Sequence, residues 1–232
     1  MKRLLLICLI ILVSGCALPP NLDDIHPVGS KYSGEIKLGD KRIPLPEGEW
    51  EMAACGTIRQ FFNAYLVKKC EFNKFNVIYI KVDKPFVERN RGYVNSLYYR
   101  KKTLHHSVVK SNYAGKPQDA WSIANTNITM KRSKRNSIYN KLLKYISVQN
   151  LSLKNFFINI SHRLTGWGAK KDFVYLSYFV NPETKGFPTG NWSDWNVARI
   201  NNYPPRVDLI EHLKTVGARQ HSELKEGVGK KY

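Results

Sequence analysis

Two stretches of the chain place a serine three residues before a lysine. Ser107 and Lys110 form one pair, and Ser222 and Lys225 form the other. On a helix this spacing puts the lysine amine one turn from the serine hydroxyl, where it can act as the base that activates a nucleophile. The companion motifs Ser-Asp-Asn and Lys-Thr-Gly are absent from the sequence, and so is a Gly-x-Ser-x-Gly elbow. We therefore expect neither serine to be catalytic.

Carboxylates that could act as general acids are scarce, because the chain has 18 Asp and Glu residues against 37 Lys and Arg residues. Glu183 follows a proline, and Asp194 lies between Trp192 and Trp195, whose rings could stack on a sugar. A glycosidase needs a carboxylic acid with a raised pKa. This loop therefore supports an alternative hypothesis, a cell-envelope hydrolase acting on peptidoglycan. The simpler interpretation is a structural loop whose tryptophans cap the core, and we prefer it.

Histidines and glycines give no sign of a metal or cofactor site. His105 and His106 are adjacent, so on a strand they point to opposite faces and cannot bind one ion together. We expect His162, in a strand, and His212, in the last helix, to lie at the edge of the core or on the surface. No phosphate-cradling glycine loop and no dinucleotide fingerprint occurs. The sequence thus predicts no metal and no cofactor, and it favours a protein that is not an enzyme.

The first sixteen residues have the layout of an export signal. Two basic residues are followed by an apolar run at 4–13, and small residues precede Cys16. A run of this length is too short to span a bilayer. The sequence Val13-Ser14-Gly15-Cys16 resembles the lipobox of bacterial lipoproteins. The resemblance implies diacylation of Cys16, cleavage after Gly15 and acylation of the new amino terminus.

This resemblance also implies a cellular location. In Gram-negative bacteria an aspartate after the lipidated cysteine favours retention at the inner membrane, and this chain has Ala17 there. The resemblance therefore implies the periplasmic face of the outer membrane, with the membrane as a partner through two or three acyl chains, which anchor durably. Residues 1–15 are the expected signal peptide. Residues 16–33 contain prolines and an Asp-Asp pair without a hydrophobic period, and we expect them to form a flexible tether.

Two cysteines remain after such processing, Cys55 and Cys70. They lie in consecutive strand-like segments, and an oxidising periplasm permits a disulfide. A bond between them would close a loop of about 15 residues and stabilise the fold by roughly 3 kcal/mol in the chain-entropy model. We expect this cross-strand disulfide, and two buried free thiols are the alternative.

The net charge of +19 is concentrated in one segment. Residues 84–144 carry fourteen Lys and Arg residues against two acids, Glu88 and Asp119, a net charge of +12. Such a field attracts anionic neighbours, which in an envelope are anionic lipid, lipopolysaccharide or peptidoglycan, whereas export argues against nucleic acid. The candidate anion-binding residues are Arg100, Lys101, Lys102, Lys131, Arg132, Lys134 and Arg135. Lysines that only solvate the surface, and an adaptor role in an envelope protein complex, stay open as alternatives.

Alternating apolar residues and turn signals predict a series of strands. Residues 35–45 predict a hairpin with a tight turn at Gly39-Asp40. Further strands are predicted at 49–58, 63–69 and 75–82, and the last of these is apolar on both faces and therefore central. We also expect a strand at 93–104. Residues 155–163 and 172–180 predict a second hairpin.

Apolar residues recur at helical spacing in two places, at 137–148 and in a helix that starts near Pro205 and has Gly217 as its C-cap. Strands in runs with helices late in the chain predict an α+β fold, mainly an antiparallel sheet of hairpins with two or so helices, one of them C-terminal. We expect one globular domain at 34–225 and a disordered tail at 226–232.

The stretch from Pro44 to Trp50 carries a second resemblance. It resembles the Pro-Leu-Pro-x-Gly-Glu-Trp signature of a set of uncharacterised exported proteobacterial proteins. That signature contains no catalytic residue that could be transferred to this chain. The sequence as a whole therefore predicts a membrane-anchored lipoprotein facing the periplasm, a binding or accessory protein with a basic face for anionic envelope components.

Overall fold

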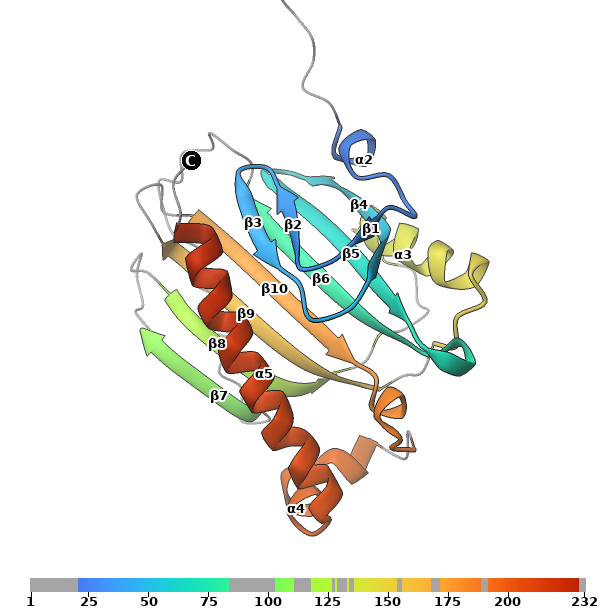
Figure 1. Ribbon diagram of the computed structural model, residues 1–232, viewed down its shortest axis with the longest axis vertical. Helices are drawn as coiled ribbons and strands as arrows, with labels where there is room; N and C mark the ends of the chain where they lie inside the picture. Colours follow the sequence, from blue (N-terminus) through green and yellow to red (C-terminus); the bar gives the residue numbers. More distant parts are fainter. Residues whose placement is uncertain are drawn as a thin grey trace, which may run out of the picture.

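A large antiparallel sheet with helices on both faces forms the body of the protein (Figure 1). The computed structural model describes residues 21–83, 103–110, 118–126, 128, 133, 136–153, 156–167, 172–188 and 192–229. Every pair of neighbouring strands in the sheet is antiparallel. The expected α+β class, with a helix at the C-terminal end, is confirmed.

The large sheet has eight strands. In spatial order they are β1 (Lys31–Tyr32), β4 (Trp50–Ile58), β5 (Phe61–Lys69), β6 (Phe75–Asp83), β10 (Asp172–Val180), β9 (Phe157–Trp167), β8 (Gln118–Thr126) and β7 (Thr103–Lys110). A separate hairpin consists of β2 (Glu35–Leu38) and β3 (Lys41–Pro44). The helices are α2 (Leu22–Ile25), α3 (Ser137–Val148), α4 (Val197–Asn201) and α5 (Pro204–Gly229), and the 3-10 helices are η1 (Glu71–Asn73), η3 (Pro182–Lys185) and η4 (Trp192–Trp195).

Elements with a strong local period lie where the sequence predicts them. The β2–β3 hairpin turns at Gly39, which has a φ of 65°, and its Ile36, Leu38 and Ile43 are buried because alternate residues face the sheet. Strand β6 is central, α3 spans 137–148, and β9 pairs with β10 as the second hairpin. Of the strand expected at 93–104, only Thr103 and Leu104 belong to the described residues, and they begin β7.

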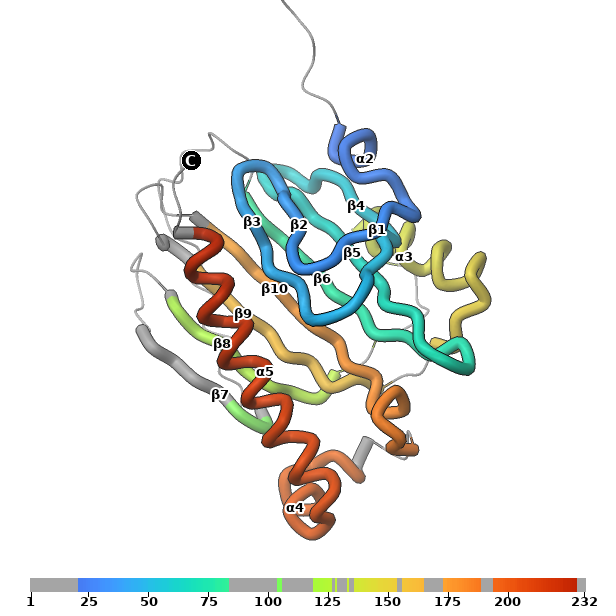
Figure 2. Tube along the Cα trace, in the orientation of Figure 1, coloured from blue at the N-terminus to red at the C-terminus, as the bar shows by residue number. Residues whose placement is uncertain are grey.

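The two faces of the sheet are covered differently. On one face lie the β2–β3 hairpin and α5, which Figure 2 shows side by side. Trp50 and Leu176 belong to the core under the hairpin, and Ile160 and Leu213 to the core under α5. On the other face α3 packs its apolar side, including Leu142, against β4, β5 and β6.

Helix α5 does not end at Gly217, so the expected C-cap is wrong. The helix continues to Gly229, and its apolar face continues with Leu224 and Val228. Gly217 is needed for a close contact, because a Cβ atom there would lie 2.5 Å from Cζ3 of Trp121 on β8. Residues 226–229 of the expected tail therefore belong to α5, with Val228 packed against the core, and residues 230–232 lie outside the described residues.

Residues 21–33, the larger part of the expected tether, are folded onto the sheet. Leu22 in α2 is only 4% exposed, and Gly29 N donates a hydrogen bond to the carbonyl oxygen of Met52. Strand β1 then pairs with β4. The burial of Leu22 and the pairing of β1 hold this segment in place, although its prolines and acidic residues had indicated flexibility. Residues 16–20 of the expected tether lie outside the described residues.

Candidate functional site

A groove of about 530 Å³ opens between the middle of α5 and the loop that joins β3 to β4. The helix and the hairpin touch near the C-terminal end of α5, where a Cβ atom at Gly227 would lie 2.5 Å from the carbonyl oxygen of Arg42. Toward the other end of the helix the two elements diverge (Figure 1). The groove occupies this space, above the ends of β5, β6 and β10.

One face of α5 forms a wall of the groove. Its lining residues His212, Thr215, Val216 and Arg219 recur at three- and four-residue intervals, so they lie on the same side of the helix. Leu213 also lines the groove and is 2% exposed, at the boundary with the core. The wall is thus apolar at its base and polar toward solvent.

The floor of the groove carries no charge and combines apolar side chains with the buried amide of Asn76. Val180 at the end of β10 is fully buried, and the half-buried ring of Tyr178 packs edge-to-face on Trp50 at a centroid distance of 5.6 Å. Burial raises the pKa of Tyr178, so its hydroxyl stays neutral at physiological pH. A ligand on this floor meets side chains that offer van der Waals contact rather than charge.

Cations from three separate elements surround the groove. They are Lys68 on β5, Lys185 on η3 and Arg219 on α5, and Glu47 is the one acid among the described lining residues. Lys185 has no ion-pair partner in the described part of the chain. The Arg219 guanidinium lies 3.9 Å from the Glu223 carboxylate, with its side chain 63% exposed. Since exposed pairs of this kind contribute little, these two cations are available to an anion.

Lys68 also holds the loop at the edge of the groove. Its ammonium group donates a hydrogen bond of 2.9 Å to the carbonyl oxygen of Glu47. Gly48, with a φ of 112°, leaves the space that the lysine occupies, because a Cβ atom there would lie 2.2 Å from Nζ. Lys68 therefore has a structural role as well as a place in the groove.

Two buried asparagines position η3 and hence Lys185. The Asn181 backbone N–H donates to Oδ1 of Asn76 at 2.7 Å, and the Asn181 side chain accepts from the Glu183 N–H at 3.0 Å as an N-cap. Lys74 donates to the carbonyl oxygen of Glu183 at 3.3 Å. The Asn-Pro pair at 181–182 is a sequence signal for such a helix start, although the signal gives no indication of a groove.

The structure corrects the expected disulfide, because Cys55 and Cys70 are both free. Cys55 on β4 pairs with Ala64 on β5, whereas Cys70 follows the end of β5 at Lys69, six positions beyond Ala64. Cys55 is buried, and its thiol lies 3.2 Å from a carboxylate oxygen of Asp23. Burial, together with this carboxylate, raises the pKa of Cys55 to about 12. Cys70 is half-buried and lines the groove, where burial raises its pKa against the opposing effect of Lys68 and Lys185.

A buried polar network lies on the other side of α5. Asp119 on β8 accepts from His221 Nε2 at 2.5 Å and from Lys225 Nζ at 2.7 Å. His221 Nδ1 in turn lies 3.3 Å from Nδ1 of His162 on β9. The Ser-x-x-Lys pattern at 222–225 therefore does not make a nucleophile and base, because the lysine bonds to Asp119. Sequence reasoning missed this network, whose members are up to 106 positions apart.

The protonation states in this network follow from burial. Burial lowers the pKa of His162 to about 3 and also lowers that of His221, so both rings are neutral at pH 7. Burial opposes ionisation of Asp119, but hydrogen bonds from Lys225 and His221 outweigh it and lower its pKa. The network is a paired, charge-balanced contact that holds α5 on the sheet. Within the described residues no group of three His, Cys, Asp or Glu side chains could hold a metal ion.

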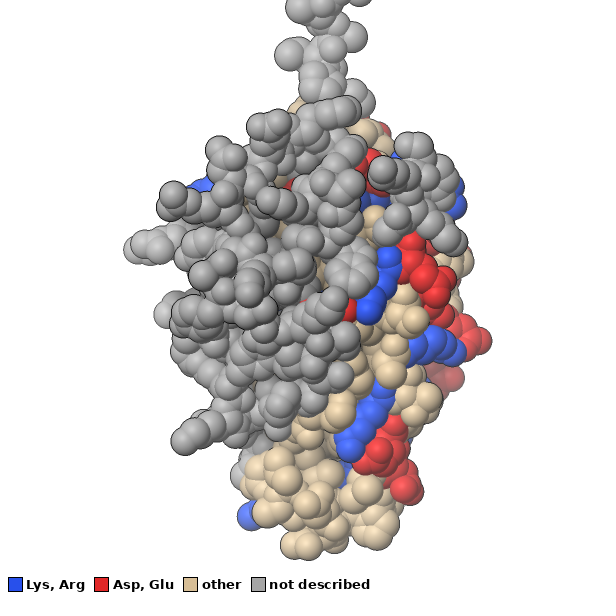
Figure 3. All heavy atoms as spheres, turned by 90° about the vertical axis from the view of Figure 1, so that its left-hand side faces the viewer, with Lys and Arg blue, Asp and Glu red and all other residues tan. Residues whose placement is uncertain are grey.

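The residues predicted for anion binding cannot be placed. Arg100, Lys101 and Lys102 lie outside the described residues, as do Lys131, Arg132, Lys134, Arg135 and the expected lipidation site Cys16. On the described part of the face in Figure 3, Lys and Arg lie beside Asp and Glu. The cations at the groove, in contrast, were not singled out from the sequence, because they come from three distant stretches.

Trp195 caps the core, as the simpler interpretation of the loop proposes for both of its tryptophans. Trp195 is fully buried and its ring lies 5.5 Å from that of Phe156. The Asp194 carboxylate accepts from Arg199 at 2.7 Å, and its backbone carbonyl accepts from Arg206 at 2.8 Å. Asp194 thus stabilises the loop, and Glu183 lies on a different 3-10 helix.

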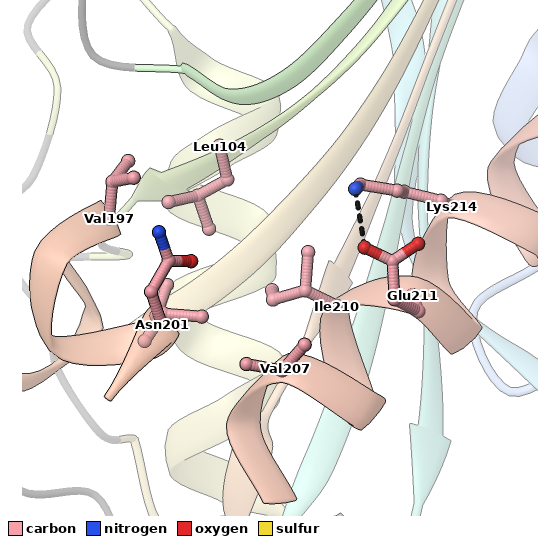
Figure 4. Close-up of a pocket in the computed structure, with 8 residues that line it drawn as sticks. Leu104, Val197, Asn201, Val207, Ile210, Glu211 and Lys214 are labelled. Atoms are coloured by element: carbon pink, nitrogen blue, oxygen red, sulfur yellow. Dashed lines mark hydrogen bonds and ion pairs between the residues drawn. The ribbon is translucent and has the colours of Figure 1, made fainter. Parts of the chain in front are cut away.

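A second hollow lies beside α4 (Figure 4). Its volume is about 70 Å³, and it is lined by aliphatic side chains that include Leu104, Val197 and Ile210. Lys214 and Glu211, joined by a 2.6 Å ion pair, border it. It is too small for more than a single small side chain. The groove between α5 and the β3–β4 loop is therefore the better candidate for ligand binding.

The remaining findings concern the membrane and known proteins. None of the helices in the described residues is long and apolar enough to span a bilayer. In comparisons by sequence and by structure, the chain matches no family model, no curated protein and no solved structure.

Proposed function

We propose that this chain is a lipid-anchored bacterial envelope protein of no recognisable enzymatic activity, a binding or accessory protein that holds an anionic envelope component in the groove beside α5. The observation that carries the proposal is that Lys68, Lys185 and Arg219 border one groove, in which Glu47 is the one acid among the described lining residues. A guanidinium and two ammonium groups together suit phosphate and carboxylate groups, with which they form charge-assisted hydrogen bonds.

The overall charge supports an anionic ligand. The chain carries a net charge of +19, so its field attracts anions toward the surface before any specific contact forms. The basic stretch at 84–144 adds to this field, whatever the position of its side chains. Long-range attraction and a local groove thus favour the same class of ligand.

The proposed anchor places the ligand at a membrane. If Cys16 is acylated, only residues 17–20 separate it from Asn21, where the folded domain begins. An extended chain covers about 3.4 Å per residue, so the domain stays within about 17 Å of the anchor. Head groups of anionic lipids in the leaflet that holds the anchor lie within this reach.

The test compares charge reversals at the groove with a matched reversal elsewhere. Lys185→Glu combined with Arg219→Glu changes the net charge by four units, as does Lys144→Glu combined with Lys37→Glu, at exposed positions outside the groove. Each protein is sedimented with phosphatidylglycerol vesicles and with phosphatidylcholine vesicles across a salt series. We expect salt-sensitive capture by the anionic vesicles alone, and at least a tenfold weaker capture of the groove variant than of its control.

Two outcomes would overturn the proposal. Equal losses in the groove variant and its control would show that total charge, and not the groove, determines capture. A variant with reversed charges at Lys131, Arg132, Lys134 and Arg135 serves as a further arm. If it loses all capture while the groove variant keeps it, the ligand binds at that cluster instead. Lipopolysaccharide and peptidoglycan replace the vesicles in parallel runs, which identify the component.

A further inference from the structure

We infer that the ligand of the groove is a single-chain anionic amphiphile, with its acyl chain along the floor and its phosphate or carboxylate head among the cations. This inference rests on the proposed function and names the class of ligand for the same groove. It follows from the way in which apolar and charged groups are separated within the groove.

The apolar groups occupy the bottom of the groove. Val180 and Leu213 are almost completely buried, so the apolar surface that a ligand can cover comes from the half-buried side chains of Val216 and Tyr178. Covering the remaining apolar surface with a hydrocarbon chain is favourable, at about 25 cal/mol for each Å² removed from water. A free phosphate ion gains nothing from this surface.

The charged groups occupy the solvent side. Arg219 and Lys185 are exposed, and Lys68 is half-buried with its ammonium group at the loop. An anionic head group can therefore bind these cations while it remains partly hydrated, so it avoids the large penalty of full desolvation. A ligand that is apolar at one end and anionic at the other matches both parts of the groove.

The size of the groove also argues for more than a bare anion. Its volume of about 530 Å³ falls in the range of pockets that bind whole small molecules, roughly 300 to 1,000 Å³. The cations lie on three different elements that border this space, and they do not come from one loop. The space between them is filled best by a ligand with an extended apolar part.

Cys70 gives a local readout of occupancy. It lines the groove and is half-buried, whereas Cys55 is 1% exposed and is an internal control. The mature, anchored chain is held in phosphatidylcholine nanodiscs, and alkylation of each cysteine by iodoacetamide is followed by mass spectrometry of its peptide. Butyl, octyl and dodecyl phosphate, inorganic phosphate and dodecanol are added in turn.

We expect the alkyl phosphates to protect Cys70, with the concentration for half-protection falling about fifteenfold for each added pair of buried methylenes until the groove is full. Inorganic phosphate and dodecanol should protect poorly at the same concentrations. Thr215→Trp, which fills the groove, should raise the half-protection concentration of dodecyl phosphate at least tenfold. Ala218→Trp, at an exposed position of α5 outside the groove, should leave it unchanged.

The outcomes separate this inference from the proposed function. Equal protection by inorganic phosphate and dodecyl phosphate would overturn the amphiphile and leave the anion site intact. Equal protection by dodecanol would overturn both, because the head group would then contribute nothing. If none of the compounds protects Cys70, the amphiphile is refuted, and the vesicle experiment alone decides whether the groove binds anionic envelope components.

Discussion

The two sides of α5 present similar residues in opposite settings. On one side Lys225 bonds at 2.7 Å to Asp119, whose side chain is 1% exposed, and two neutral histidines complete the network. On the other side Arg219 borders an open groove and lies 3.9 Å from the exposed Glu223. The comparison shows that a cation serves structure where the fold supplies a buried counter-charge, and is available for binding where it does not.

The largest expected effect is the loss of the Asp119 carboxylate, the buried counter-charge on the side of α5 that packs against the sheet. Asp119→Ala leaves His221 and Lys225 without their carboxylate partner, and breaking a buried pair from one side typically costs 3 kcal/mol or more. We expect the free energy of unfolding to fall by about 3 kcal/mol, measured by urea denaturation. Glu223→Ala, which removes the exposed partner on the groove side, should cost less than about 0.5 kcal/mol. Similar losses in both variants would refute the distinction between the two sides.

The second-largest expected effect is a loss of stability at acid pH, caused by the buried His162 beneath α5. The pKa of His162 is about 3 in the folded chain and 6.5 when exposed, so unfolding takes up a proton between these values and the free energy of unfolding falls as the pH falls. Between pH 6 and pH 4 the free energy of unfolding should therefore fall more steeply in the wild type than in His162→Gln. The two slopes should differ by up to about 1.4 kcal/mol per pH unit. Parallel slopes for the wild type and His162→Gln would show that His162 is already protonated in the fold.

A smaller effect is expected at the close contact between α5 and β8. Replacing a glycine within a helix by alanine usually adds about 1 kcal/mol of stability. At Gly217 the new methyl group would meet the ring of Trp121 at 2.5 Å, and overpacking of this kind costs about 1 to 3 kcal/mol. We therefore expect Gly217→Ala to lower the free energy of unfolding by about 1 kcal/mol in net terms. A gain in stability would show that the helix can shift away from the sheet without cost.

The sequence predicts most strands and helices correctly, because the hydrophobic pattern of each element depends on residues that are close together in the chain. The β2–β3 hairpin follows from alternation around Gly39-Asp40, and α3 from apolar residues at helical spacing. The expected disulfide is wrong because the register of β4 and β5 places Cys55 opposite Ala64 and away from Cys70. The tight turn near Arg59 makes Cys55 face Ala64, and the position of that turn could have been used to find this pairing.

The candidate site depends on contacts between distant residues, which no local pattern specifies. Lys68, Lys185 and Arg219 border one groove only because the end of β5, η3 and the middle of α5 lie near one another. Asp119 and His221 pair for a similar reason. One signal for the longer helix was present, since the apolar period of α5 continues to Leu224 and Val228 beyond Gly217.

The smallest expected effect on stability lies on the groove side. Lys185→Ala and Arg219→Ala remove cations that have no buried counter-charge among the described residues, so each should change the free energy of unfolding by less than about 0.5 kcal/mol. The same two variants should weaken capture by phosphatidylglycerol vesicles, because they remove charge from the groove. Urea denaturation and vesicle sedimentation of the same preparations measure both effects. A binding loss without a stability loss separates the two sides of α5, whereas a stability loss above 1 kcal/mol would make these cations part of the fold.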